Sequence, residues 1–109
     1  MLVIVEVSVD GHERPSAGSP IHVEVRDTSL ADASSRTISA AADVVRGQSG
    51  SWLHTLELDV PRLPARATVW AHVDVDRDGR VSRGDFITMT SYPVTPGDEV
   101  KVAVKVRKV

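Results

Sequence analysis

The chain has 109 residues, of which 41% are hydrophobic and 26% are charged, as is typical of a soluble globular domain. A chain of this length accommodates one hydrophobic core, so residues 1–109 are predicted to form a single domain. A formal net charge of −2 argues against a nucleic-acid-binding protein, which normally carries a basic face. The chain has no cysteine, which excludes disulfides, thiolate catalysis and cysteine-ligated zinc.

The N-terminal residues predict neither a membrane span nor a signal peptide. No apolar run approaches the length of about 18 residues that a transmembrane helix needs. The first six residues, MLVIVE, have no basic n-region and no cleavage site, and they alternate like a strand. We therefore expect a cytoplasmic protein, or a periplasmic or outer-membrane-associated one if a signal segment has been removed and Met1 added.

Apolar and polar residues alternate along most of the chain, which predicts β-strands. The first strand spans residues 2–9, and the same pattern predicts strands at 21–26, 52–60, 66–75, 85–94 and 100–106. Residues 35–45 are ambiguous, because their three consecutive alanines would suit a helix, but the surrounding strands favour a strand there as well. About seven antiparallel strands without a helix indicate an all-β fold, a single β-sandwich.

Residues 74–85, DVDRDGRVSRGD, have the ligand spacing of a twelve-residue calcium-binding loop. Calcium is a hard cation that takes six to eight oxygen ligands, so the side chains of alternate residues must converge and a glycine must allow the sharp turn. The predicted ligands are the side chains of Asp74, Asp76, Asp78 and Asp85, the main-chain carbonyl of Arg80, and Ser82 directly or through water. The apolar residue at position 8, Val81, is expected to anchor the loop to the core.

The arginines of this loop support the same interpretation. Arg77, Arg80 and Arg83 occupy positions 4, 7 and 10, none of which uses its side chain as a ligand. They also reduce the local negative charge, and position 12 is Asp85 rather than the longer glutamate, so we expect weak calcium binding or tolerance of magnesium. The alternative interpretation is an Asp-Gly hairpin turn with a polar tip.

The flanks of the loop differ from those of a helix-loop-helix calcium site. Residues 67–73 and 86–92 are rich in β-branched and aromatic side chains and alternate with period two. The loop is therefore predicted to join two strands.

The other reactive side chains indicate no enzyme. The four histidines lack the spacing of a zinc motif, and no serine lies in a nucleophile motif. We expect His54 to be partly buried and hydrogen-bonded. His72 is expected to face outward, or else to support the neighbouring loop. Trp52 is predicted to fill the core. Trp70 lies on the strand face opposite to Val69, Ala71 and Val73 and is a candidate for a partner-binding surface.

Two segments resemble the YbaY/YscW family of small bacterial lipoproteins, which includes pilotins of type III secretion. Residues 25–33, VRDTSLADA, are similar to the family's SLADA signature, and residues 90–94, TSYPV, are similar to its late strand. The resemblance implies a small β-sandwich without enzymatic activity and, in the pilotin members, help in bringing an outer-membrane secretin to its place. The chain lacks the family's lipid-attachment cysteine.

These observations predict a non-enzymatic calcium-binding module. Calcium would order the hairpin loop at residues 74–85, either for stability or for binding a protein partner. The alternative is a pilotin-like chaperone of a secretion system in which metal is not needed.

Overall fold

Strands make up all the regular secondary structure of the described residues. The computed structural model describes residues 1–29, 36–46 and 53–109. In chain order the strands are β1 (Leu2–Val9), β2 (Pro20–Asp27), β3 (Arg36–Val44), β4 (Leu53–Asp59), β5 (Ala67–Val73), β6 (Phe86–Thr88), β7 (Tyr92–Pro93) and β8 (Glu99–Lys108). Within these residues there is no helix long and apolar enough to cross a membrane.

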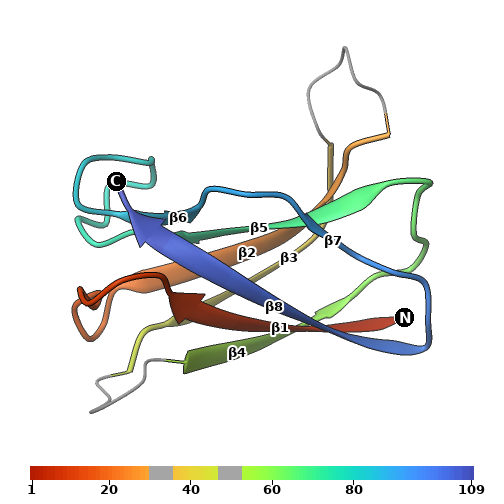
Figure 1. Cartoon of the computed structure of the whole chain (residues 1–109), viewed down its shortest axis with the longest axis horizontal. Coiled ribbons are helices and arrows are strands. Elements are labelled where there is room, and N and C mark those ends of the chain that lie inside the picture. Colours follow the sequence, from red (N-terminus) through yellow and green to blue (C-terminus); the bar gives the residue numbers. More distant parts are fainter. Residues whose placement is uncertain (30–35, 47–52) are drawn as a thin grey trace.

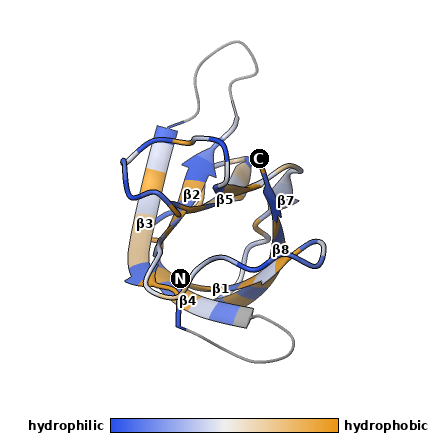
Figure 2. Cartoon of the chain, turned by 90° about the vertical axis from the view of Figure 1, so that its left-hand side faces the viewer, coloured by the Kyte–Doolittle hydropathy of each residue, from blue (hydrophilic) through white to orange (hydrophobic). Residues whose placement is uncertain are grey.

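The strands belong to one sheet with the order β3-β2-β5-β6-β8-β1-β4, and β7 pairs with β5 beside it. One half, β3-β2-β5, and the other, β8-β1-β4, are joined by the short strand β6 and curl toward each other. Seen end-on, the sheet is a nearly closed barrel (Figure 2). The first and last strands lie side by side and run in the same direction (Figure 1), because β1 pairs parallel with β8 and antiparallel with β4.

Side chains close the sheet where backbone pairing ends, between β3 and β4. Ser39 Oγ donates a hydrogen bond to the Asp59 carbonyl at 2.9 Å, and His54 Nε2 lies 3.0 Å from Asp43 Oδ2. Hydrogen bonds from the Val44 N–H and from His54 hold the pKa of Asp43 below its ordinary value of 3.8. Polar contacts of this kind cover two edge strands that would otherwise expose unpaired backbone groups.

The core lies between the two halves of the sheet and is built mainly from valine. Alternate residues of β1, β2, β5 and β8 point inward, and most of them are fully buried. The inward side chains include Val3, Val5 and Val7 of β1, Ile21, Val23 and Val25 of β2, Val69, Ala71 and Val73 of β5, and Val102, Val104 and Val106 of β8. β-Branched residues suit this arrangement, because they pack well on a pleated surface and have restricted χ1 angles.

The prediction of an all-β, sandwich-like fold is confirmed, and the ambiguous segment at 35–45 forms β3. Two details differ from the prediction. The predicted strand at 85–94 is split into β6 and β7, so the described residues form eight strands, and the β1–β8 pair is parallel rather than antiparallel. Alternation along a strand determines which face is buried but carries no information on the direction of the neighbouring strand, which explains the second difference.

Candidate metal centre

The 74–85 loop joins β5 to β6, as predicted, and is anchored at both ends by backbone hydrogen bonds. The Asp74 N–H donates to the Pro20 carbonyl at 2.8 Å, and the Val109 N–H donates to the Asp85 carbonyl at 2.8 Å. The guanidinium of Arg77 adds a third anchor through a 3.1 Å hydrogen bond to the Gly18 carbonyl. The loop is therefore attached to the start of β2 and to the C-terminal residue.

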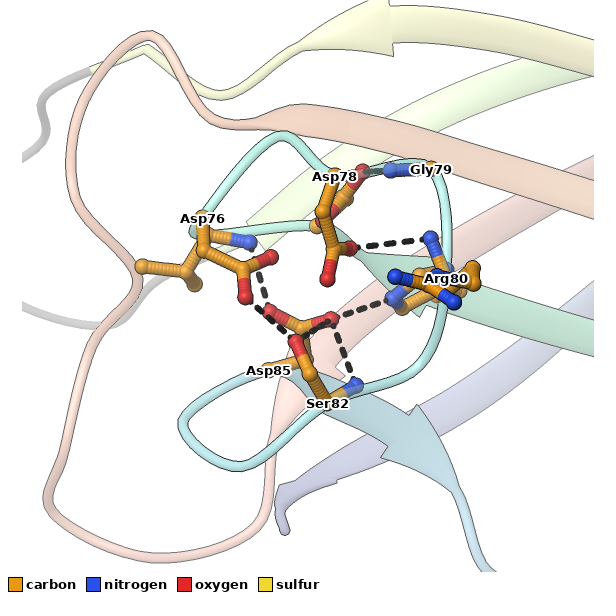
Figure 3. A network of polar contacts seen from close by, with 9 residues as sticks. Asp76, Asp78, Gly79, Arg80, Ser82 and Asp85 are labelled. Atoms are coloured by element: carbon orange, nitrogen blue, oxygen red, sulfur yellow. Dashed lines mark hydrogen bonds and ion pairs between the residues drawn. The ribbon is translucent and has the colours of Figure 1, made fainter.

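The backbone of the loop turns back on its own side chains. Arg77 and Gly79 have positive φ angles of 59° and 78°, and the N–H of Gly79 donates to Asp74 Oδ2 at 2.8 Å. The N–H of Arg80 donates to Asp78 Oδ1 at 2.9 Å (Figure 3). Glycine suits position 6, because it adopts a positive φ angle without the strain that a Cβ introduces.

The four predicted carboxylates converge in the middle of the loop. Asp74, Asp76, Asp78 and Asp85 each place one oxygen so that all four lie within 4.8 Å of one another. The labelled side chains of Asp76, Asp78 and Asp85 point toward one another in Figure 3. The cluster spans from solvent to interior, because Asp76 and Asp78 are exposed whereas Asp74 is 8% and Asp85 0% exposed.

One buried oxygen of this cluster has no hydrogen-bond partner among the described residues. Asp74 Oδ2 accepts the Gly79 N–H, but Asp74 Oδ1 is buried and receives no hydrogen bond. A buried polar atom without a partner costs free energy, and the cost is greater for a charged group. A cation bound among the carboxylates would satisfy this atom and relieve the repulsion between them.

Asp85 is the most enclosed carboxylate and is held from several sides. Its Oδ1 accepts the Val75 N–H at 2.9 Å. Its Oδ2 lies 2.8 Å from His72 Nε2 and accepts the Ser82 N–H at 3.2 Å. These contacts tie the beginning and the end of the loop to one buried side chain.

Ser82 connects the inner and outer parts of the cluster. Its hydroxyl donates to Asp76 Oδ2 at 2.5 Å and lies 3.4 Å from Asp85 Oδ2. The hydrogen bond from Ser82 is the largest cause that holds the pKa of Asp76 below its ordinary value of 3.8. Ser82 therefore favours the ionised form of Asp76, which is the form that binds metal.

The loop arginines do not pair directly with the carboxylates of the cluster in the described part of the chain. Within residues 1–29, 36–46 and 53–109, the ion pairs formed do not include Arg77, Arg80 or Arg83. Arg77 instead reaches away to Gly18. The donor set is thus rich in oxygen and anionic, and it fits a hard divalent cation such as Ca²⁺ or Mg²⁺.

The apolar residue at position 8 of the loop faces solvent. Val81 was expected to anchor the loop to the core but is 46% exposed, which corrects that prediction. The apolar anchor is Phe86, the first residue of β6, which is 3% exposed. A strand that follows the loop supplies its own inward side chain, so position 8 is free to face solvent. The role of the Arg80 carbonyl stays a prediction.

The other predicted residues lie outside the loop. His54 is 8% exposed and contacts Asp43, which confirms the expected partly buried, hydrogen-bonded histidine. Trp70 lies half-buried on the outer face, where the Arg26 guanidinium stacks 4.2 Å from its ring centroid. The predicted core role of Trp52 and most of the SLADA segment lie outside the described residues.

Comparison with known proteins identifies the fold but no sequence family. No protein-family model and no curated protein sequence matches the chain. A solved structure does match, that of an alternative pilotin from the type II secretion system of Vibrio cholerae. The match has a TM-score of 0.75 at 25% sequence identity and covers 100% of this chain and 96% of the pilotin. The fold is pilotin-like. Since the match extends over both chains almost completely, the pilotin-like fold includes every strand described above.

Within this pilotin-like fold, the resemblance to the YbaY/YscW family stays a prediction, as does the calcium loop.

The main contact that sequence reasoning did not resolve is that of His72 with Asp85. His72 lies on the outer face of β5 with Trp70, as its parity predicts, yet it is only 6% exposed because the loop covers it. The proximity of His72 to position 1 of the loop was the available signal.

Proposed function

We propose that the protein is a non-enzymatic binding module of the pilotin type, which recognises a protein component of a secretion system. The observation that supports this proposal is the match of the whole chain to the Vibrio cholerae pilotin at a TM-score of 0.75. The similarity of the SLADA and TSYPV segments to YbaY/YscW proteins points in the same direction. Since fold alone does not determine function, the partner must be tested directly.

The test is binding of the purified full chain to the secretin of a secretion system from the same bacterium. We expect co-purification after co-expression, and a dissociation constant in the micromolar range or tighter by calorimetry, equivalent to about −8 kcal/mol. The Vibrio cholerae pilotin with its own secretin is the positive control. If that pair binds and this chain does not, the pilotin role is wrong for this protein.

We further propose that a divalent cation, calcium in the first instance, binds the 74–85 loop and orders it. The unpartnered Asp74 Oδ1 among four converging carboxylates supports this second function. Asp74, Asp76, Asp78 and Asp85 would hold the ion, together with the Arg80 carbonyl and Ser82. An ordered loop would present a fixed surface beside the C-terminal residue, to which it is hydrogen-bonded.

Thermal unfolding of metal-stripped protein in calcium, in magnesium and in EDTA tests the cation site. A ligand that binds only the folded state at a hundredfold excess over its dissociation constant adds about 2.7 kcal/mol to the free energy of unfolding, so calcium should raise Tm. The Asp76→Ala/Asp78→Ala double variant should lose the response, and Asp98→Ala, which removes an exposed carboxylate from a distant turn, should keep it. An unchanged Tm of the wild-type protein at millimolar calcium would refute the site.

A further inference from the structure

We infer that His72 is a positioning residue of the cation loop, which fixes Asp85 so that its Oδ1 faces the ion as a single ligand. This inference rests on the proposed cation site and assigns roles within it. His72 lies outside the twelve-residue loop, so the ligand spacing of the loop assigns it no role.

The two carboxylate oxygens of Asp85 differ in the number of hydrogen-bond donors that they face. Oδ2 faces two N–H donors, His72 Nε2 at 2.8 Å and the Ser82 N–H at 3.2 Å, while the Ser82 hydroxyl, 3.4 Å away, gives its proton to Asp76. Among the residues that the structure describes, Oδ1 accepts one hydrogen bond, from the Val75 N–H at 2.9 Å. Because a carboxylate oxygen has two lone pairs, Oδ1 keeps one free for a cation, whereas Oδ2 is saturated.

His72 is suited to hold this arrangement because it is itself fixed. It projects from the regular strand β5, it is 6% exposed, and its ring packs against Trp70 with centroids 5.6 Å apart. A ring nitrogen of His72 and one oxygen each of Asp74 and Asp85 lie within 4.8 Å of one another, so the imidazole is next to both buried carboxylates. Residues that hydrogen-bond to metal ligands typically contribute a factor of about 10 to 100 in metal affinity.

This arrangement explains how a short aspartate can serve at position 12. A glutamate at that position reaches the ion through a longer side chain and binds it with both oxygens. Here the carboxylate is carried into the loop by the start of β6 and is locked by His72 and Val75. Compared with a loop that has a bidentate glutamate, this site offers the ion one fewer protein oxygen and one more position for a water molecule.

The experiment compares His72→Gln with His72→Asn in the 109-residue chain. The amide nitrogen of glutamine occupies a position close to that of Nε2 and keeps a donor for Asp85, whereas that of asparagine falls short. His22→Asn is the matched control, because His22 pairs with His72 across β2 and β5 but contacts Glu24 instead of Asp85. Calcium affinity is measured by calorimetry, and Tb³⁺ luminescence lifetimes in H2O and D2O count the water molecules on the bound ion.

We expect His72→Asn to bind calcium at least about tenfold more weakly than wild type and to carry more water on bound Tb³⁺. His72→Gln should restore most of the affinity and the wild-type water count, and His22→Asn should match wild type in both. If His72→Asn binds like wild type, or binds weakly with an unchanged water count, the positioning role is overturned while the cation site stands. If wild type binds neither Ca²⁺ nor Tb³⁺, the cation site itself fails.

Discussion

Single side chains on the outer face of β2 stabilise the sheet through charge. Glu24 is 9% exposed and receives hydrogen bonds from Thr37 on β3 and from Arg26 at 3.1 Å, with His22 Nε2 at 3.3 Å. Burial raises the pKa of Glu24, but the hydrogen bonds from Thr37 and Arg26 and the charges of Arg26 and His22 together hold it below its ordinary value of 4.5. Glu24 thus joins β2 to β3 most strongly when it is ionised.

The lowered pKa makes Glu24 a source of acid sensitivity. Its stabilisation is fully present above the unfolded-state pKa near 4.5 and is lost as the pH falls through the lower folded-state value. We expect Glu24→Gln to reduce the free energy of unfolding by about 1 kcal/mol at neutral pH and by progressively less below the unfolded-state pKa.

Urea unfolding at a series of pH values measures this difference. Glu57→Gln, which changes an exposed glutamate on β4, is the control and should show almost no difference at any pH. A Glu24→Gln difference that stays constant as the pH falls would mean that the ionised form of Glu24 is not what stabilises the sheet.

At the scale of the element, β1 is the strand on which the second half of the sheet depends. It pairs with β8 on one side and with β4 on the other, and its inward residue Val5 lies opposite Val102 and Leu56. Val5 is completely buried. The first strand therefore cannot complete its contacts until the last strand of the chain has arrived.

Removal of two methyl groups from this position should be costly. We expect Val5→Ala to lower the free energy of unfolding by about 2 to 3 kcal/mol, because the variant loses apolar burial and leaves a cavity between strands that cannot close around it. Chemical denaturation of Val5→Ala and of Glu6→Ala, on the opposite face of β1, measures the effect. The control should change by about 0.5 kcal/mol or less, and equal losses in both variants would contradict the burial argument.

At the scale of the whole molecule, the proposed cation loop and the C-terminal residue meet at one end of the barrel. The Gly84 N–H donates to the Val109 carbonyl at 3.1 Å, and Val109 returns a hydrogen bond to Asp85. The carboxylates follow the last residue of β5, a strand of the half that contains the β3 edge. Loss of a bound cation would therefore loosen the loop and the end of β8 together.

Much of this organisation was predictable from local patterns. Period-two alternation identified the strands, because only one face of each strand meets the core. The spacing of Asp74, Asp76 and Asp78 identified the carboxylate cluster, because a cation loop draws its ligands from neighbouring residues. Local information did not reveal the break at residues 89–91 between β6 and β7, since these residues are compatible with a strand.

The sequence by itself determined the all-β class, the inward valines and the members of the acidic loop, because each depends on contacts between residues close together in the chain. Only the tertiary structure decided the parallel pairing of β1 with β8, the closure between β3 and β4, and the burial of His72 against Asp85. These features depend on how distant strands approach one another. That approach is governed by the packing of the complete core, and the residue pattern of a single segment does not specify it.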